Sequence, residues 1–162
     1  MISYPRTWKQ LSLKYDFSLN IDDSPNSKQV SDWVRKSKID IIFIMVGDIL
    51  RKDIINSPRL GIINKHAAIL PSCKGLFPFF WAKIFDIPTG ITFHKVDLGI
   101  DSGKILSQSL IKITKQDNVK TLFRKLIKTS FKQIKIFVPN LINGEYTKYK
   151  QKNIKSNYWR RR

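Results

Sequence analysis

Two apolar runs that follow one another closely constrain the fold of this chain most strongly. The first runs from Ile41 to Val46 without a polar residue, and the second runs from Leu60 to Asn64, where it ends. Strands that are apolar along their whole length are typical of a parallel sheet with both faces covered. Residues Ile49 to Ser57 can form a short helix between the runs. The order strand, helix, strand predicts an α/β fold with a mostly parallel sheet and helices on both faces.

The rest of the chain predicts further strands and helices around this unit. The expected elements are a strand over Tyr15–Ile21, a helix over Lys28–Lys36, a helix over Gly75–Phe85, strands over Thr89–Val96 and Lys104–Ile113, and a long amphipathic helix that begins near Asp117 as its N-cap. We expect the basic helix to pack on the sheet, although a helix of this kind can also lie on a membrane surface. The residues from Glu145 to Arg162 are polar and basic, and we expect them to be irregular.

The charge of the chain favours anionic partners. There are 30 Lys and Arg residues against 12 Asp and Glu residues, a formal charge of +18. Such a field attracts nucleotides, phosphorylated substrates, nucleic acid or anionic membranes, although abundant lysine alone would give the same charge. Cys73 is the single cysteine, so no intramolecular disulfide forms. No segment has the length of a secretory signal or a membrane span, so we expect a cytoplasmic protein without a membrane partner.

Three polar residues at predicted strand ends and loops form the candidate chemistry. Asn64 and His66 follow a buried strand, and Asp101 lies in a loop with two glycines. Ligands of α/β sheets bind beyond the carboxyl ends of the strands. The spacing of Asn64 and His66 places both side chains on one side of an extended backbone. An amide can donate to an oxyanion, an imidazole can donate or move a proton, and a carboxylate can orient the imidazole. Each residue is ordinary alone, but the combination suits acyl-type transfer.

Other catalytic arrangements are missing from the sequence. There is no Gly-x-Ser-x-Gly elbow, no glycine-rich phosphate loop and no His/Cys cluster with metal-ligand spacing. Cys73 has no histidine close to it in sequence, although pairing in space is open. We therefore expect the substrate's own nucleophile to attack directly, with no covalent enzyme intermediate and no metal.

Three ordered motifs carry a resemblance to a known family. They are Asn64-Lys65-His66-Ala67-Ala68-Ile69-Leu70-Pro71 with Gly75, Pro78 and Trp81-Ala82 after it, then Gly90-Ile91-Thr92-Phe93-His94, then Asp97-Leu98-Gly99-Ile100-Asp101-Ser102-Gly103. The set resembles the folate-dependent formyltransferases, which include methionyl-tRNA, glycinamide ribonucleotide and sugar N-formyltransferases. The resemblance implies a Rossmann-like catalytic domain over residues 1–150, followed by a basic tail over residues 151–162. We expect this domain to be partial at its N-terminus, because the family's first strand and helix are missing.

The resemblance also implies roles for individual residues. Asn64 and His66 would stabilise the oxyanion at the formyl carbon, and Asp101 would position His66 and assist proton removal from the amine. The donor would be 10-formyltetrahydrofolate, a co-substrate. The remaining implied contacts are Asp48, Ile49, Leu50, Val96 and Asp97 for the donor, and His94, Lys74 and Gly75 for the acceptor. Ala67 replaces the family's usual proline, which we expect to be tolerated because no functional group is lost.

The acceptor implied by the resemblance is a primary amine, most plausibly an amino sugar on an anionic nucleotide carrier. The barrel-like second domain of the tRNA-using members is absent, so we expect tRNA to be the less favoured partner. Three alternatives stay open: a methionyl-tRNA formyltransferase-like protein, a hydrolase of formyltetrahydrofolate, and an inactive remnant or basic nucleic-acid-binding protein. The high positive charge and the basic end of the chain are the reasons to consider a nucleic-acid-binding protein. The sequence makes no prediction about oligomeric state.

Overall fold

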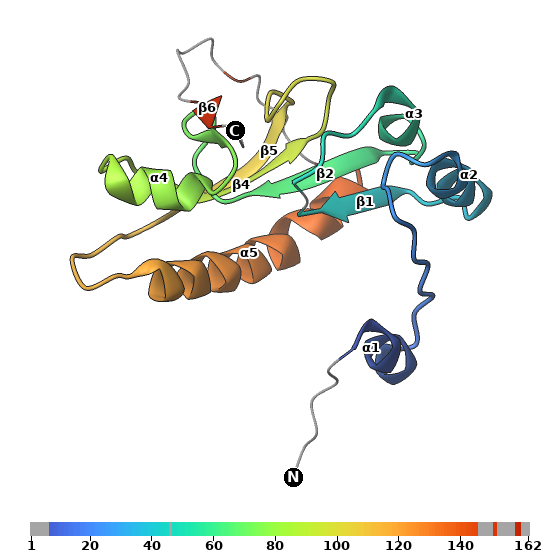
Figure 1. Cartoon of the computed structure of the whole chain (residues 1–162), viewed down its shortest axis with the longest axis horizontal. Coiled ribbons are helices and arrows are strands. Elements are labelled where there is room, and N and C mark those ends of the chain that lie inside the picture. The colour runs from blue at the N-terminus through green and yellow to red at the C-terminus, as the bar shows by residue number, and fades with distance from the viewer. Residues whose placement is uncertain (1–6, 46, 146–150, 152–157, 160–162) are drawn as a thin grey trace.

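The computed structural model describes residues 7–45, 47–145, 151 and 158–159. Its main sheet has the spatial order β1–β2–β4–β5 (Figure 1). The bounds of these strands are Ile41–Ile44, Gly61–His66, Thr89–Lys95 and Ile105–Ile111. β1 and β2 are parallel, with the short helix α3 (Lys52–Ile55) between them in the chain. The predicted strand–helix–strand unit is therefore confirmed.

The remaining strand pairs of the main sheet are antiparallel, so this sheet is mixed. β2 pairs with β4 and β4 pairs with β5, both in the antiparallel sense. The α/β prediction is confirmed, but the expectation of a mostly parallel sheet is wrong for the residues described. For β4 and β5, the physical reason lies in their connection. β4 and β5 are joined by the loop 96–104 and have no helix between them, and a direct return of this kind makes the strands antiparallel.

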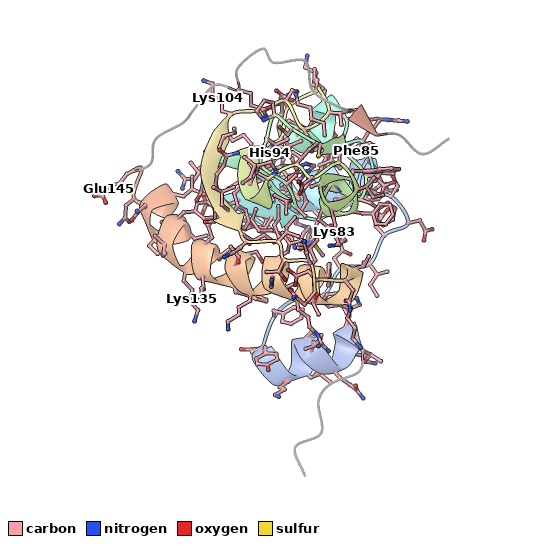
Figure 2. All side chains as sticks on the ribbon, turned by 90° about the vertical axis from the view of Figure 1, so that its left-hand side faces the viewer. Lys83, Phe85, His94, Lys104, Lys135 and Glu145 are labelled. Atoms are coloured by element: carbon pink, nitrogen blue, oxygen red, sulfur yellow. The ribbon has the colours of Figure 1, made fainter. Side chains whose placement is uncertain are left out.

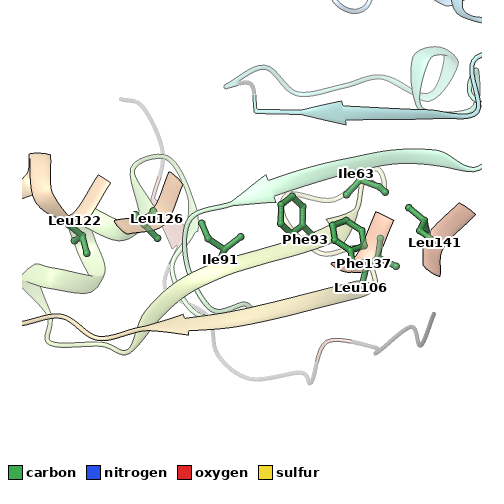
Figure 3. Close-up of a cluster of buried hydrophobic side chains, with 8 residues drawn as sticks. All are labelled: Ile63, Ile91, Phe93, Leu106, Leu122, Leu126, Phe137 and Leu141. Carbon is green, nitrogen blue, oxygen red and sulfur yellow. The ribbon is translucent and has the colours of Figure 1, made fainter. Parts of the chain in front are cut away.

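Helices cover both faces of the sheet, as predicted. Ile62 of β2 packs in one apolar cluster with Val34 of α2 (Lys28–Lys36) and Ile54 of α3. The next residue, Ile63, belongs to a second cluster on the opposite face. That second cluster contains Ile91, Phe93 and Leu106 from the sheet with Leu122, Leu126, Phe137 and Leu141 from the helix α5, Val119–Ile142 (Figure 3). Successive strand residues point to opposite faces, so one strand serves both clusters.

The long helix α5 packs on the sheet, as expected, but begins differently from the prediction. Its N-cap is Asn118, whose side chain accepts a hydrogen bond from the backbone N–H of Thr121. Asp117, the predicted cap, instead accepts hydrogen bonds from Thr114 and Lys125 and joins the preceding turn to the helix. In the part of the chain that the structure describes, no helix combines the length and the apolar character needed to cross a membrane.

Two predictions are wrong for the N-terminal part of the described chain. The first helix, α1, spans Trp8–Tyr15 and has no buried residue, and no strand follows it where Tyr15–Ile21 was expected to form one. A reciprocal capping interaction between Thr7 and Gln10 favours the helix. Figure 1 shows α1 set apart from the sheet. β1 lies at the sheet edge, and Phe43 within it is 43% exposed, so the expected burial on both faces is also wrong.

The end of the chain contains one regular element. β6 (Tyr158–Trp159) pairs in parallel with β3 (Lys74–Gly75), which precedes the helix α4 (Pro78–Ile84). The prediction of an irregular tail is therefore wrong at β6. Single-sequence patterns miss a pairing of this kind, because a two-residue strand has no periodicity to detect. Most of the expected basic tail lies outside the described residues.

Gly90→Ala is expected to lower the free energy of unfolding by roughly 2–4 kcal/mol, because the new methyl group overpacks the sheet. A Cβ atom at Gly90 would lie 2.0 Å from the carbonyl oxygen of Ser109 and 2.8 Å from Cδ1 of Ile69. β4 and β5 would have to separate to accommodate it. Urea denaturation measures the change. Gly47→Ala is the control, since its nearest contact would be Leu76 Cδ2 at 3.6 Å. Equal unfolding midpoints for the two variants would contradict the prediction.

Candidate active site

Three side chains from the sheet surround the carboxylate of Asp101. Asn64 and His66 project from the same side of β2, as the alternating pattern predicts, and His94 projects from the neighbouring strand β4. Asn64 Nδ2 donates to Asp101 Oδ1 at 3.2 Å. His66 Nδ1 lies 3.5 Å from Oδ2, and His94 Nε2 lies 3.4 Å from Oδ1. The structure thus brings together the three residues predicted to be catalytic and adds His94 to them.

The loop that carries Asp101 holds its side chain toward β2. Asp101 has a φ of 47°, in the left-handed region that aspartate adopts more readily than most residues. Within the loop, Asp97 Oδ1 accepts hydrogen bonds from Gly99 N and Ser102 Oγ. From outside the loop, the backbone N–H of Gly75 donates to Asp101 Oδ2 at 2.8 Å. The carboxylate is therefore held by backbone geometry as well as by its side-chain neighbours.

Backbone carbonyl groups determine how the two imidazole rings are protonated. His66 Nε2 lies 2.9 Å from the carbonyl oxygen of Cys73, and His94 Nδ1 lies 2.9 Å from that of Lys95. Because a carbonyl oxygen can only accept, these two ring nitrogens carry the hydrogens. The other nitrogen of each ring faces Asp101. A proton that either ring takes up is therefore held between that ring and the carboxylate.

The histidines are deeply buried beside the carboxylate. His94 is 2% exposed, and Figure 2, in which it is labelled, shows it among the side chains in the interior of the molecule. Burial alone would raise the pKa of Asp101, but His94, His66 and the N–H of Gly75 outweigh it and lower the pKa to about 2. Burial lowers the pKa of His66, and the carboxylate of Asp101 acts in the opposite direction. The carboxylate is thus ionised at neutral pH and can receive a proton.

Asp101 is expected to stabilise the fold above about pH 4 and to lose this effect in acid. Its pKa is about 2 in the folded protein against 3.8 for the unperturbed group. The folded state therefore binds this proton more weakly than the unfolded state, which stabilises the fold by about 2 kcal/mol above the unfolded pKa. The stabilisation declines as the pH falls from about 4 to about 2.

Urea denaturation of the wild type and of Asp101→Asn checks this pH dependence. The difference in free energy of unfolding between the two proteins should shrink between about pH 5 and about pH 2, because only the wild type has the titrating carboxyl group. A difference that stays constant over this range would show that Asp101 does not have a depressed pKa.

A pocket of about 900 Å³ opens beside this cluster. Asn64, His66, His94 and Asp101 line it, and so do Gly75 and all the residues expected to contact the donor: Asp48, Ile49, Leu50, Val96 and Asp97. Lys74 is not among the lining residues. It is half-buried in β3, directly before Gly75. The expected site residues, with the exception of Lys74, therefore border one cavity.

Sequence reasoning missed part of the pocket wall. Leu76, Phe77 and Phe79 line it from the start of α4, and Phe123 lines it from α5. The aromatic run after Gly75 was a usable signal, because aromatic side chains commonly line pockets for small molecules. Phe123 gave no local signal, since only the packing of α5 brings it to the site. In the described ranges, no group of three His, Cys, Asp or Glu residues could hold a metal ion.

Comparisons with known sequences identify relatives of this chain. The sequence model of a protein family described as formyl transferase matches residues 20–136. A methionyl-tRNA formyltransferase of Enterococcus faecalis is 34% identical over 148 residues, which cover 88% of this chain and 46% of that protein. The matched segments cover between 31% and 47% of several methionyl-tRNA formyltransferases. The chain thus spans about half the length of these curated relatives.

Solved structures show the same fold. An N-formyltransferase from Helicobacter canadensis, in complex with folinic acid and dTDP-3-aminofucose, matches with a TM-score of 0.73 and 23% identity, and the match covers 98% of this chain and 56% of that one. The sugar 3N-formyltransferase WlaRD, solved in the presence of dTDP and 5-N-formyl-THF, matches with a TM-score of 0.72 and 26% identity over 94% of this chain and 53% of that one. The short sheet described here is therefore part of a known enzyme architecture.

Proposed function

Because this chain belongs to the formyl transferase family, we propose that it transfers a formyl group from 10-formyltetrahydrofolate to a primary amine. One observation carries the proposal: Asn64 and His66 each place a nitrogen within 3.5 Å of the Asp101 carboxylate at the wall of a large pocket. An amide, an imidazole and a carboxylate in contact supply an oxyanion donor and a proton acceptor in one place.

Each residue of the cluster has a proposed role in the transfer. Asn64 Nδ2 carries two hydrogens, of which one is bound by Asp101, so the other is available to the formyl oxygen as negative charge develops there. Asp101 accepts the proton that the attacking amine loses, directly or through a water, and His66 Nδ1 can share that proton. When bound, the folate would supply the formyl group. The bond from the formyl carbon to the folate nitrogen would break as the bond to the amine forms, and the proton held by Asp101 would pass to that nitrogen. No side chain of the protein becomes acylated.

The pocket suits a folate donor in size and character. Its volume of about 900 Å³ lies within the range of sites for drug-sized molecules. Leu50 and Val96 give one part of the wall an apolar surface, and the loop residues 47–50, 96–97 and 99–101 line the same space. We propose that the pterin ring lies between these loops and that backbone groups provide much of its hydrogen bonding. His94 faces Asp101, and in our proposal it reaches the acceptor only through that carboxylate.

Two acceptors are supported by different observations. An amino sugar on a nucleotide carrier is our first candidate, because the WlaRD enzyme is a sugar formyltransferase and was solved with dTDP. The formal charge of +18 suits the diphosphate of such a carrier. Methionyl-tRNA is the second candidate, because the Enterococcus faecalis relative is more similar in sequence. The charge favours both acceptors equally and does not decide between them.

A donor-consumption assay tests the proposal. The protein is mixed with 10-formyltetrahydrofolate and, separately, with a nucleotide-linked amino sugar, with methionyl-tRNA or with no acceptor. Release of tetrahydrofolate is followed together with mass spectrometry of the acceptor. We expect formylation of the amino sugar and its loss in His66→Ala. Formylation of methionyl-tRNA alone would select the second acceptor, and formate release without an acceptor would indicate hydrolysis. No consumption of the donor in any mixture would refute the proposed activity.

A further inference from the structure

We infer that Gln151 is a positioning residue that holds the Asp101 carboxylate in place through the backbone of the turn that carries it. Gln151 Nε2 donates to the carbonyl oxygens of both Asp101 and Gly103, each at 2.9 Å. A primary amide has two N–H bonds on its nitrogen, so one side chain joins both ends of this short turn. The inference rests on the proposed role of Asp101 in formyl transfer.

The turn needs such a contact because its backbone is constrained at both joined residues. Asp101 adopts the left-handed conformation, which is unfavourable for a residue with a side chain. Gly103 lies so close to β4 that a Cβ atom there would be 1.8 Å from the carbonyl oxygen of Lys95. Loss of the Gln151 amide would let the turn relax, and the carboxylate would move with it. The distances from Asp101 to Asn64 and His66 would then change.

A second contact from the same end of the chain reaches Asp101 by another route. β6 pairs with β3, and Gly75 of β3 donates its backbone N–H to Asp101 Oδ2. Gln151 therefore contacts the backbone of Asp101 directly, and β6 contacts β3, the strand that contains Gly75. This arrangement distinguishes Gln151 from a residue that only ties down the end of the chain. A tether alone would leave Asp101 unaffected when it is removed.

Titration of the histidines tests the positioning role without any substrate. The chain has two histidines, so their imidazole NMR signals can be assigned with one His variant. Burial lowers the pKa of His66, whereas Asp101 and the hydrogen bond to Cys73 raise it, and His94 and Lys74 lower it further. In Gln151→Ala and in Gln151→Met, which keeps the length of the side chain but has no N–H, the pKa of His66 should fall. Gln116→Ala, at an exposed glutamine before α5, is the matched control and should leave it unchanged.

Kinetics provide the second measurement. Both Gln151 variants should lose roughly tenfold in kcat, with the KM for 10-formyltetrahydrofolate changed by less than about twofold, because the carboxylate is misplaced and the donor pocket is intact. An unchanged His66 pKa together with unchanged kcat would overturn the inference and leave Gln151 as a tether of the chain end. If the pKa of His66 falls but the wild type transfers no formyl group, the positioning role stands and the proposed function fails.

Discussion

Asp101→Asn is expected to lower kcat for formyl transfer by roughly 10³-fold or more, because an amide cannot accept the proton that the amine must lose. The substitution is expected to keep the backbone conformation of the turn. Asparagine adopts the left-handed backbone conformation as readily as aspartate, and its oxygen can still accept the hydrogen bond from Gly75 N. Removal of the negative charge also removes the interaction that favours the protonated form of His66. The loss should therefore appear in kcat, with little change in the KM for the donor.

Asp86→Asn is the matched control for this substitution. Asp86 also has a positive φ, 51°, but it is exposed in the turn after α4 and does not line the pocket. Rates of tetrahydrofolate release are compared for the two variants at equal protein concentration. If Asp101→Asn kept more than about a tenth of the wild-type kcat, Asp101 could not be the main proton acceptor.

Asn64→Asp is expected to lower kcat by roughly 10²-fold to 10³-fold, because it removes a hydrogen-bond donor from the oxygen that gains negative charge. It also places a second carboxylate at the position where Asn64 Nδ2 now lies, 3.2 Å from Asp101 Oδ1. Two carboxylates at this separation cannot both ionise easily, so the pKa of one of them rises. Asn64→Ala removes the donor without adding charge. Wild-type activity in Asn64→Ala would rule out the proposed donor role.

Asn64→Asp should also change how the free energy of unfolding depends on pH, in the direction opposite to the effect of Asp101 in the wild type. A carboxyl group whose pKa is raised in the folded state stabilises the fold at low pH and loses this effect as the pH rises through the raised value. The free energy of unfolding of Asn64→Asp, relative to wild type, should therefore fall between about pH 4 and pH 7. Asn56→Asp, at an exposed position after α3, should show no such trend. Urea denaturation at the two pH values makes the comparison.

Much of the candidate site could be predicted from short stretches of sequence. The two-residue spacing of Asn64 and His66 places them on one side of β2 whatever the rest of the fold does, because side chains alternate along an extended strand. Their position at the end of a buried apolar run predicted the sheet edge where ligands bind. Asp101 followed from its glycine-bearing loop and from the family resemblance. The structure confirms that the three residues meet.

Other features depended on contacts between distant parts of the chain. Nothing near His94 in sequence showed that its Nε2 would face Asp101, and nothing near Gln151 showed that its amide would join Asp101 to Gly103. The direction of β4 and the exposure of Phe43 at the sheet edge were likewise not predicted. Each of these features depends on contacts between segments that are distant in the sequence.

For this protein, the sequence by itself determined the strand–helix–strand unit of β1, α3 and β2, the two apolar faces of β2 and the chemical character of the site. These properties depend on residues only a few positions apart, so the local geometry of the backbone is enough to derive them. Tertiary structure alone decided the mixed sheet, the pairing of β6 with β3 and the environment of the Asp101 carboxylate. These properties depend on pairing between distant segments, and the free energy of such pairing comes from burial and hydrogen bonds that exist only in the folded chain.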